Sequence, residues 1–157
     1  PFASEISNRS AQVCKRLDIP YCLFARPAWE PSASGNWTIL QDESDAANYI
    51  DPGAIVFLAT GRKTLERFGN LQSCRLICRQ IDPPSGPFPF ANGEFLIGRP
   101  PFSVEDEIAL FKSLKLDWLI VKNAGGTASF SKLEAARELD LKVDLDFTIF
   151  FGSAALT

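Results

Sequence analysis

The chain has 157 residues, of which 46% are hydrophobic and 22% are charged, and this average globular usage excludes a disordered or collagen-like protein. The 16 basic and 19 acidic residues give a formal net charge of −3, so the chain has no overall attraction to nucleic acid or to an anionic membrane. Any anionic ligand must therefore be held by a local group of cations.

Histidine is absent, which excludes a Ser-His-Asp or Cys-His catalytic system, a histidine zinc site and a histidine pH switch. The four cysteines, Cys14, Cys22, Cys74 and Cys78, form no C-x-x-C pair, and the last two flank Leu76 in an apolar stretch. We therefore expect core cysteines, with no metal site and no disulfide framework.

The sequence shows no signal peptide and no apolar run of about 18 residues, so we expect a cytoplasmic protein that does not span a membrane. It begins with Pro1-Phe2-Ala3 and contains no methionine. Because a helix is predicted almost immediately after Pro1, we expect that upstream sequence is missing and that the chain is a fragment.

The first part of the chain predicts a helix, a strand, a loop and a second helix. Apolar residues at helical spacing indicate an amphipathic helix over residues 4–17 that ends before Pro20. A short buried strand is expected over 21–25, followed by a loop to Asn36 and a helix at about 42–50.

The rest of the chain alternates strands with helices. Residues 54–59 are apolar on both faces, as in a central parallel strand that is covered on each side. Further strands are predicted at 75–78, 95–97, 117–121 and 141–143, and helices around Leu65 and Phe68, from Ser103 with Asp106 in a capping box, and from Phe130. This order predicts an α/β fold with a Rossmann-like, doubly wound parallel sheet, into which the tail at 144–157 fits poorly.

In such sheets, ligands bind beyond the carboxyl ends of the strands. Thr60-Gly61-Arg62 follows one central strand and offers a hydroxyl, a glycine that admits a close ligand and a guanidinium at the start of a helix. This combination predicts an anion site. The alternative is a glycine required only for the turn, with an exposed Arg62.

Lys122-Asn123-Ala124-Gly125-Gly126-Thr127 follows the other central strand. The two glycines can present a concave group of N–H donors, Lys122 adds a positive charge, and Thr127 can cap the next helix or bond a phosphate. The alternative is a tight turn in which Thr127 is only an N-cap. The loop is neither a G-x-G-x-x-G motif nor a P-loop, so it does not by itself identify a nucleotide.

Other candidates carry weaker signals. Arg26 follows the strand predicted over 21–25 and is therefore expected at the same edge of the sheet. Trp29 and Trp37 are interpreted as packing anchors rather than platforms for a flat ligand. Glu105, Asp106 and Glu107 fall in the first turn of a helix, where the dipole stabilises negative charge, so they are interpreted as structural. The spacing identifies no catalytic acid–base pair.

Seven segments match one protein family in order and spacing. They are residues 1–7, 26–29, 60–62, 82–84, 97–102, 122–127 and 132–137. Over residues 1–143 the chain therefore resembles the precorrin-6A reductase, or cobalt-precorrin-6A reductase, family of cobalamin biosynthesis and porphyrin metabolism.

The resemblance implies an oxidoreductase that uses NADPH or NADH to reduce a ring double bond of precorrin-6A, or of its cobalt form, to give precorrin-6B. It implies two Rossmann-like halves with the ligands between them, residues 1–51 being the remainder of an incomplete first half and 52–157 the second. The implied ligands are the dinucleotide and a tetrapyrrole, with no nucleic acid or membrane. The residues expected to hold them are Thr60, Gly61, Arg62, Lys122, Asn123, Gly125, Gly126 and Thr127, with Arg26 on a substrate carboxylate.

Two departures from the family pattern shape these expectations. Family members begin with a strand and a Gly-Gly-Thr loop ahead of the position matching Pro1, and they finish the last strand with an apolar run, where this chain has Asp144-Leu145-Asp146-Phe147. We expect an N-terminally truncated member with an atypical tail. The alternative function is a non-catalytic Rossmann-like module that binds a nucleotide or tetrapyrrole, or an inactive fragment that pairs with a partner chain.

Overall fold

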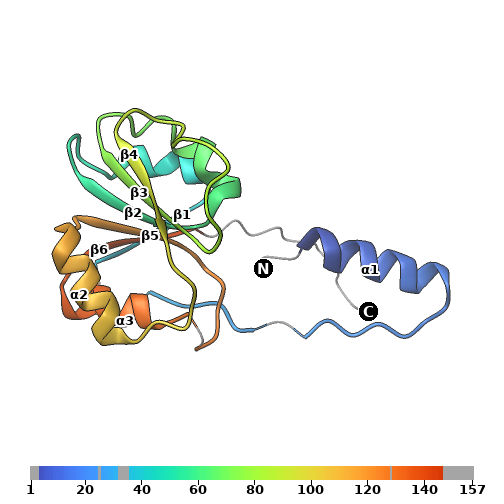
Figure 1. Cartoon of the computed structure of the whole chain (residues 1–157). Helices are drawn as coiled ribbons and strands as arrows, with labels where there is room; N and C mark the ends of the chain where they lie inside the picture. The colour runs from blue at the N-terminus through green and yellow to red at the C-terminus, as the bar shows by residue number, and fades with distance from the viewer. Residues whose placement is uncertain (1–3, 25, 32–35, 128, 147–157) are drawn as a thin grey trace.

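The computed structural model describes residues 4–24, 26–31, 36–127 and 129–146. Six strands form one sheet in the order β1-β6-β5-β2-β3-β4, and every pairing is parallel (Figure 1). The strands are β1 Trp37–Leu40, β2 Ile55–Ala59, β3 Arg75–Gln80, β4 Gly93–Ile97, β5 Trp118–Lys122 and β6 Lys142–Asp146. The parallel α/β sheet predicted from the sequence is confirmed.

Helices cover both faces of the sheet. The 3-10 helices η1 (Glu43–Asn48) and η2 (Arg62–Phe68) lie on one face, while α2 (Val104–Leu114) and α3 (Ser131–Glu138) lie together on the other (Figure 1). The central strand β2 packs against the helices on both faces of the sheet. Val56 and Leu58 lie in the core with η2, and Phe57 lies in the core with α2. Residues 54–59 are apolar because both of their faces are buried.

The chain order creates a switch point between β2 and β5. From β2 the chain passes through η2 to β3 and then to β4 on one side, and α2 carries it back to β5 on the other side of β2. In open α/β sheets, the crevice for ligands lies where the strand order reverses, at the carboxyl ends of the strands. The two loops singled out in the sequence follow these two strands.

The strand predicted over 21–25 is wrong for residues 21–24, and residue 25 lies outside the described residues. Residues 21–24 pair with no strand of the described chain, and Leu23 and Phe24 are 58% and 93% exposed. The Tyr21 hydroxyl instead donates to the Ser7 carbonyl (3.2 Å), which holds this segment beside the helix α1 (Ser4–Arg16). An apolar run becomes a strand only where a neighbouring strand completes its hydrogen bonds.

A strand that the sequence did not predict, β1, completes the other end of the sheet. Trp37 lies beside Val143 and Leu40 beside Asp146, so β1 is an edge strand. Its residues lie between the predicted loop, which ends at Asn36, and the helix predicted at about 42–50. Because β6 spans Lys142–Asp146, the first residues of the expected atypical tail belong to the sheet, whereas 147–157 lie outside the described residues. The domain boundary after residue 51 falls between η1 and β2 and stays a prediction.

Local signals set several helix starts and buried positions. In the capping box before α2, the Ser103 hydroxyl accepts from the Asp106 N–H (3.0 Å) and the Asp106 carboxylate accepts from the Ser103 N–H (3.3 Å), as predicted. Cys74 and Cys78 are buried, also as predicted, and burial raises the pKa of the Cys78 thiol to about 11.

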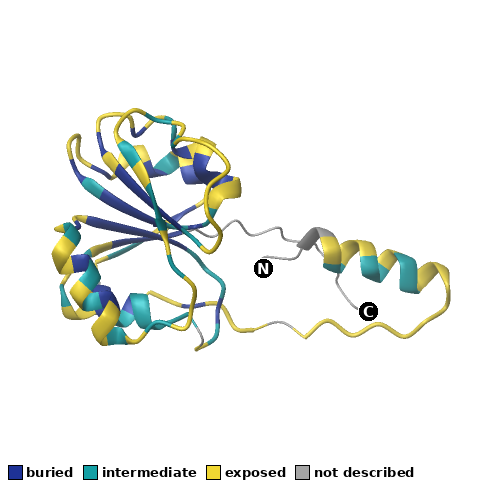
Figure 2. Ribbon diagram, in the orientation of Figure 1, coloured by how far each residue is buried: buried dark blue, intermediate teal, exposed yellow. Residues whose placement is uncertain are grey.

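The core assignment is wrong for the two cysteines near the N-terminus, because Cys22 is exposed and Cys14 is only partly covered on α1. In Figure 2, α1 stands apart from the sheet and shows exposed and intermediate residues, in agreement with the 71% exposure of Ile6. The helix itself matches the prediction, but the described chain buries little of its apolar side. None of the helices in the described ranges is long and apolar enough to cross a membrane.

One carboxylate lies inside the sheet. Asp144 sits on β6 between Thr38 of β1 and Ile120 of β5, and it is fully buried. Neither carboxylate oxygen makes a hydrogen bond of normal geometry to the described residues. Burial raises the pKa of Asp144 from 3.8 to about 7, and the nearby Thr38 hydroxyl offsets only part of that rise.

Asp144 predicts a pH-dependent stability. Because the pKa is higher in the native chain than in the unfolded chain, the native state binds the extra proton, and stability falls as pH rises from about 4 through about 7. We expect this group to cost on the order of 3–4 kcal/mol in free energy of unfolding by about pH 8. Asp144→Asn should remove that slope in urea unfolding measured at several pH values.

The control is Asp82→Asn, which changes an exposed carboxylate and should leave the slope intact. An Asp144→Asn protein with the wild-type dependence of unfolding free energy on pH would contradict the assignment.

Candidate functional site

The two predicted ligand loops lie side by side at the carboxyl edge of the sheet. Ala59 pairs with Val121, so Thr60 and Lys122 begin the two loops on neighbouring strands. Thr60 is 6% exposed, and its hydroxyl has no hydrogen-bond partner within the described ranges. A buried polar group without a partner is costly, so this hydroxyl is a candidate for a contact with a ligand or a water molecule.

The Thr60-Gly61-Arg62 turn leads directly into η2. Gly61 has φ +83°, a conformation that glycine adopts readily, and a Cβ there would meet nothing within 4 Å. Arg62 is exposed and lines a hollow of about 210 Å³ together with neighbouring residues of η2 and with residues of the segment between β3 and β4, such as Pro84 and Pro89. No described residue of 122–127 lines this hollow, so Arg62 is not brought beside the second loop there.

The second loop is clamped by Trp29. The Trp29 N–H donates to Asn123 Oδ1 (2.8 Å), Asn123 Nδ2 donates to the Trp29 carbonyl (2.8 Å), and Trp29 Nε1 donates to the Gly126 carbonyl (2.7 Å). Trp29 is 7% exposed and its ring lies 6.0 Å from that of Phe130, so it is a packing anchor, as predicted. The Asn123 amide was expected to meet a ligand, but its oxygen and its nitrogen are both hydrogen-bonded to the backbone of Trp29.

Gly125 and Gly126 make room for Pro27 and Arg26 of the same chain. They have φ +63° and +75°, and a Cβ on Gly125 would stand 2.1 Å from the Pro27 carbonyl oxygen. A Cβ on Gly126 would stand 2.8 Å from Arg26 Cδ. Arg26 therefore reaches this edge, as expected, although residues 21–24 form no strand.

Thr127 does not cap the following helix. The N-cap of α3 is Phe130, which makes no side-chain capping bond, and Thr127 contributes only its carbonyl, to the Phe130 N–H (3.1 Å). The predicted capping role is therefore wrong, while a role of the exposed Thr127 toward a ligand stays a prediction.

A buried ion pair that the sequence analysis missed lies beside this edge. Arg79 on β3 binds Glu107 on α2 through two hydrogen bonds of 2.8 and 2.7 Å, with Arg79 9% and Glu107 1% exposed. The guanidinium carbon also lies 5.0 Å from the Phe57 ring centre and 4.3 Å from that of Phe102. From the sequence, Glu107 was interpreted as a charge that the helix dipole stabilises. Its position one helical turn before Phe111, on the buried side of α2, was the signal that could have indicated its burial.

This ion pair adjoins a hollow of about 160 Å³ at the carboxyl ends of β2 and β3. Its lining includes Arg79, Gln80, Phe102 and, from the start of α3, Lys132. Lys132 Nζ donates to the Ser129 carbonyl (2.7 Å). The pKa of Lys132 is lowered to about 8, mainly by burial and in smaller part by the Arg79 charge, while the Glu107 charge opposes both effects.

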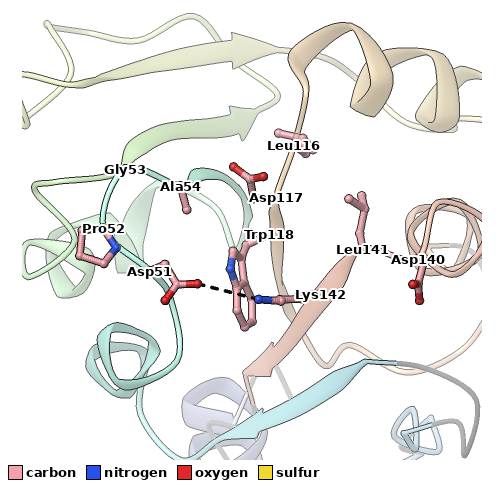
Figure 3. Close-up of a pocket in the computed structure, with 10 residues that line it drawn as sticks. All are labelled: Asp51, Pro52, Gly53, Ala54, Leu116, Asp117, Trp118, Asp140, Leu141 and Lys142. Carbon is pink, nitrogen blue, oxygen red and sulfur yellow. Dashed lines mark ion pairs between the residues drawn. The ribbon is translucent and has the colours of Figure 1, made fainter.

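A larger hollow, of about 490 Å³, lies at the opposite edge (Figure 3). It opens at the amino ends of β2, β5 and β6, where Lys142 Nζ lies 4.0 Å from Asp51 and 5.0 Å from the centre of the Trp118 ring. Since parallel α/β sheets bind ligands at their carboxyl edge, the candidate site stays with the loops after β2 and β5.

The fold and the site define a doubly wound α/β protein with cations and glycine-bearing loops at the switch point. A family model described as precorrin-6x reductase CbiJ/CobK matches residues 1–145. The precorrin-6A reductase of Rhodococcus erythropolis is 38% identical over 144 residues, 91% of this chain and 58% of that protein. The precorrin-6A reductase of Rhodobacter capsulatus is 34% identical over 146 residues, 92% of this chain and 58% of that protein.

A solved structure, CobK precorrin-6A reductase, superimposes with a TM-score of 0.87 at 34% identity, covering 93% of this chain and 60% of that one. The chain belongs to the precorrin-6x reductase family, and the resemblance seen in the sequence is confirmed. It spans less than two thirds of the length of these relatives.

The close approach at Gly125 predicts a selective destabilisation. Gly125→Ala should lower the free energy of unfolding by about 2–4 kcal/mol, because it adds a clash with the Pro27 carbonyl to the strain of a positive φ. Gly53→Ala is the matched control, since Gly53 has φ +86° and open space, and strain alone should cost about 1–2 kcal/mol. Equal losses in urea unfolding would show that Pro27 does not pack on Gly125.

Proposed function

We propose that this chain acts in cobalamin biosynthesis by reducing a ring double bond of precorrin-6A, or of its cobalt form, to give precorrin-6B, with NADPH or NADH as the hydride donor. The observation that carries the proposal is the placement of the loops that begin at Thr60 and Lys122 on adjacent strands of a precorrin-6x reductase family fold. The relatives named precorrin-6A reductase support the substrate class.

The residues at this edge suit two anionic ligands. A precorrin carries many carboxylates and a nicotinamide dinucleotide carries phosphates, so both favour guanidinium and ammonium groups. The first loop fits a phosphate better, because the Thr60 hydroxyl has no hydrogen-bond partner among the described residues and Gly61 leaves open space before Arg62. The second loop is closed over by Pro27 and Arg26, which favours a role for Lys122 and Arg26 toward substrate carboxylates.

The dinucleotide, when bound, supplies the hydride, and the protein's part is to bind and orient. Holding both ligands at one sheet edge makes the transfer effectively unimolecular. Trp29 and Asn123 keep Arg26 against the Gly126 loop, so the clamp positions a cation rather than contacting the ligand itself.

A non-catalytic binding module is the second candidate. The exposed apolar residues of α1 and of 21–24, such as Ile6 and Phe24, favour a chain that pairs with a partner and binds these ligands without turnover. Turnover by the isolated chain separates the two candidates.

Ligand binding by variants should show which loop holds which ligand. We expect Arg62→Ala to weaken NADPH binding about 10-fold or more, and Lys122→Ala to weaken binding of the tetrapyrrole carboxylate to a similar extent, because each removes a charge-assisted contact. Nicotinamide fluorescence and tetrapyrrole absorbance measure the two affinities. Lys63→Ala and Lys112→Ala remove exposed cations from η2 and α2 and should change neither affinity.

Reduction of precorrin-6A by the wild-type chain, followed by loss of the dihydronicotinamide absorbance, completes the test. A folded chain that binds neither ligand would refute the proposed function. Binding of both ligands without reduction would support the non-catalytic module.

A further inference from the structure

Reduction of a double bond by hydride also requires a proton. A bound dinucleotide would supply the hydride to one carbon of the ring double bond, and the electron pair left on the neighbouring atom would then have to take up a proton. Histidine is absent from this chain, so another acid must supply it.

The hollow beside the Arg79–Glu107 pair offers such an acid. It lies at the carboxyl ends of β2 and β3, on the same edge as the loops that begin at Thr60 and Lys122. Among its described lining residues, the charged groups are Arg79 and Lys132. The serine and glutamine side chains of the lining carry no proton that is acidic near neutral pH.

Arg79 is unable to act as the acid. Its guanidinium holds Glu107 through two hydrogen bonds and lies between the rings of Phe57 and Phe102. A guanidinium does not give up its proton in proteins. The pair instead fixes one wall of the hollow and sets the charges that face Lys132.

We propose that Lys132 is the proton donor of the reduction, its Nζ delivering a proton to the ring atom next to the carbon that receives the hydride. The inference rests on the proposed function and assigns a further residue to it. In the step, an N–H bond of the ammonium breaks and a bond from hydrogen to the ring atom forms. The ring double bond is reduced, the dihydronicotinamide is oxidised to the nicotinamide cation, and the neutral amine regains a proton from water.

The geometry holds the ammonium in place. One of its three N–H groups donates to the Ser129 carbonyl at 2.7 Å, and the ammonium has two further donors to offer a ligand. The charged groups that face it are Arg79 from β3, which disfavours the ammonium form, and Glu107 from α2, which favours it. With a pKa of about 8, set mainly by burial, Lys132 is protonated at neutral pH and gives up its proton readily.

The first test uses turnover and a matched pair of variants. Lys132→Arg keeps the positive charge but removes the acid, so kcat should fall about 100-fold or more while KM for both ligands changes little. The fall in kcat of the wild type above about pH 8 should disappear. In Lys132→Ala, added primary amines should restore part of the rate, and Lys112→Arg should behave as the wild type. An active wild type whose Lys132→Arg variant keeps both its kcat and its pH profile overturns the proposal.

A second test does not depend on turnover. Acylation of the amines at a series of pH values, followed by mass spectrometry, gives the titration midpoint of each lysine. Lys132 should titrate near 8 and be protected when the tetrapyrrole carboxylate is bound, while bound tetrapyrrole should leave labelling of the exposed Lys112 unchanged. An ordinary midpoint near about 10.4, or labelling that bound tetrapyrrole leaves unchanged, overturns the proposal while the reductase function stands. A chain that binds neither ligand refutes both.

Discussion

The parallel pairing of β2 with β5 is the constraint on which the rest of the molecule depends. Both strands are buried on their two faces, so helices must cover each side of the sheet. Parallel neighbouring strands are joined only by crossover connections, so the carboxyl ends of all the strands lie at the same edge of the sheet. Because the strand order reverses at this pair, the loops that begin at Thr60 and Lys122 meet without a crossover above them. The site follows from the topology before any side chain is considered.

Two buried charged groups show opposite solutions to the cost of removing a charge from water. Glu107 is paired with Arg79, which donates a hydrogen bond to each of its two oxygens. Asp144 has no such partner among the described residues, and burial raises the pKa of its carboxyl toward neutrality instead. The first arrangement gives a rigid wall at the carboxyl edge, and it leaves Lys132 as a cation with a lowered pKa beside that wall. The second makes the stability of the sheet sensitive to pH.

Some of the residues that were expected to bind a ligand make contacts within the protein instead. Asn123 pairs with the backbone of Trp29, and Gly125 makes room for the Pro27 carbonyl. At the end of a strand, an amide side chain makes the same kinds of hydrogen bond to a ligand as to a neighbouring backbone. A glycine lets either of them approach closely, because it has no Cβ. The clamp keeps Arg26 at the carboxyl edge, so these residues support the site indirectly.

The sequence by itself determined the alternation of strands and helices, the capping box at Ser103, the buried central strands and the edge on which ligands are expected. These features depend on hydrophobic periodicity and on contacts a few residues apart, which a linear reading detects. Only the tertiary structure decided that residues 21–24 form no strand, that 37–40 do, and that Arg79 and Lys132 line one hollow. The deciding partners lie 28 residues apart for Arg79 and Glu107 and 94 for Trp29 and Asn123. Such contacts leave no local pattern, because they exist only after the sheet has brought distant segments together.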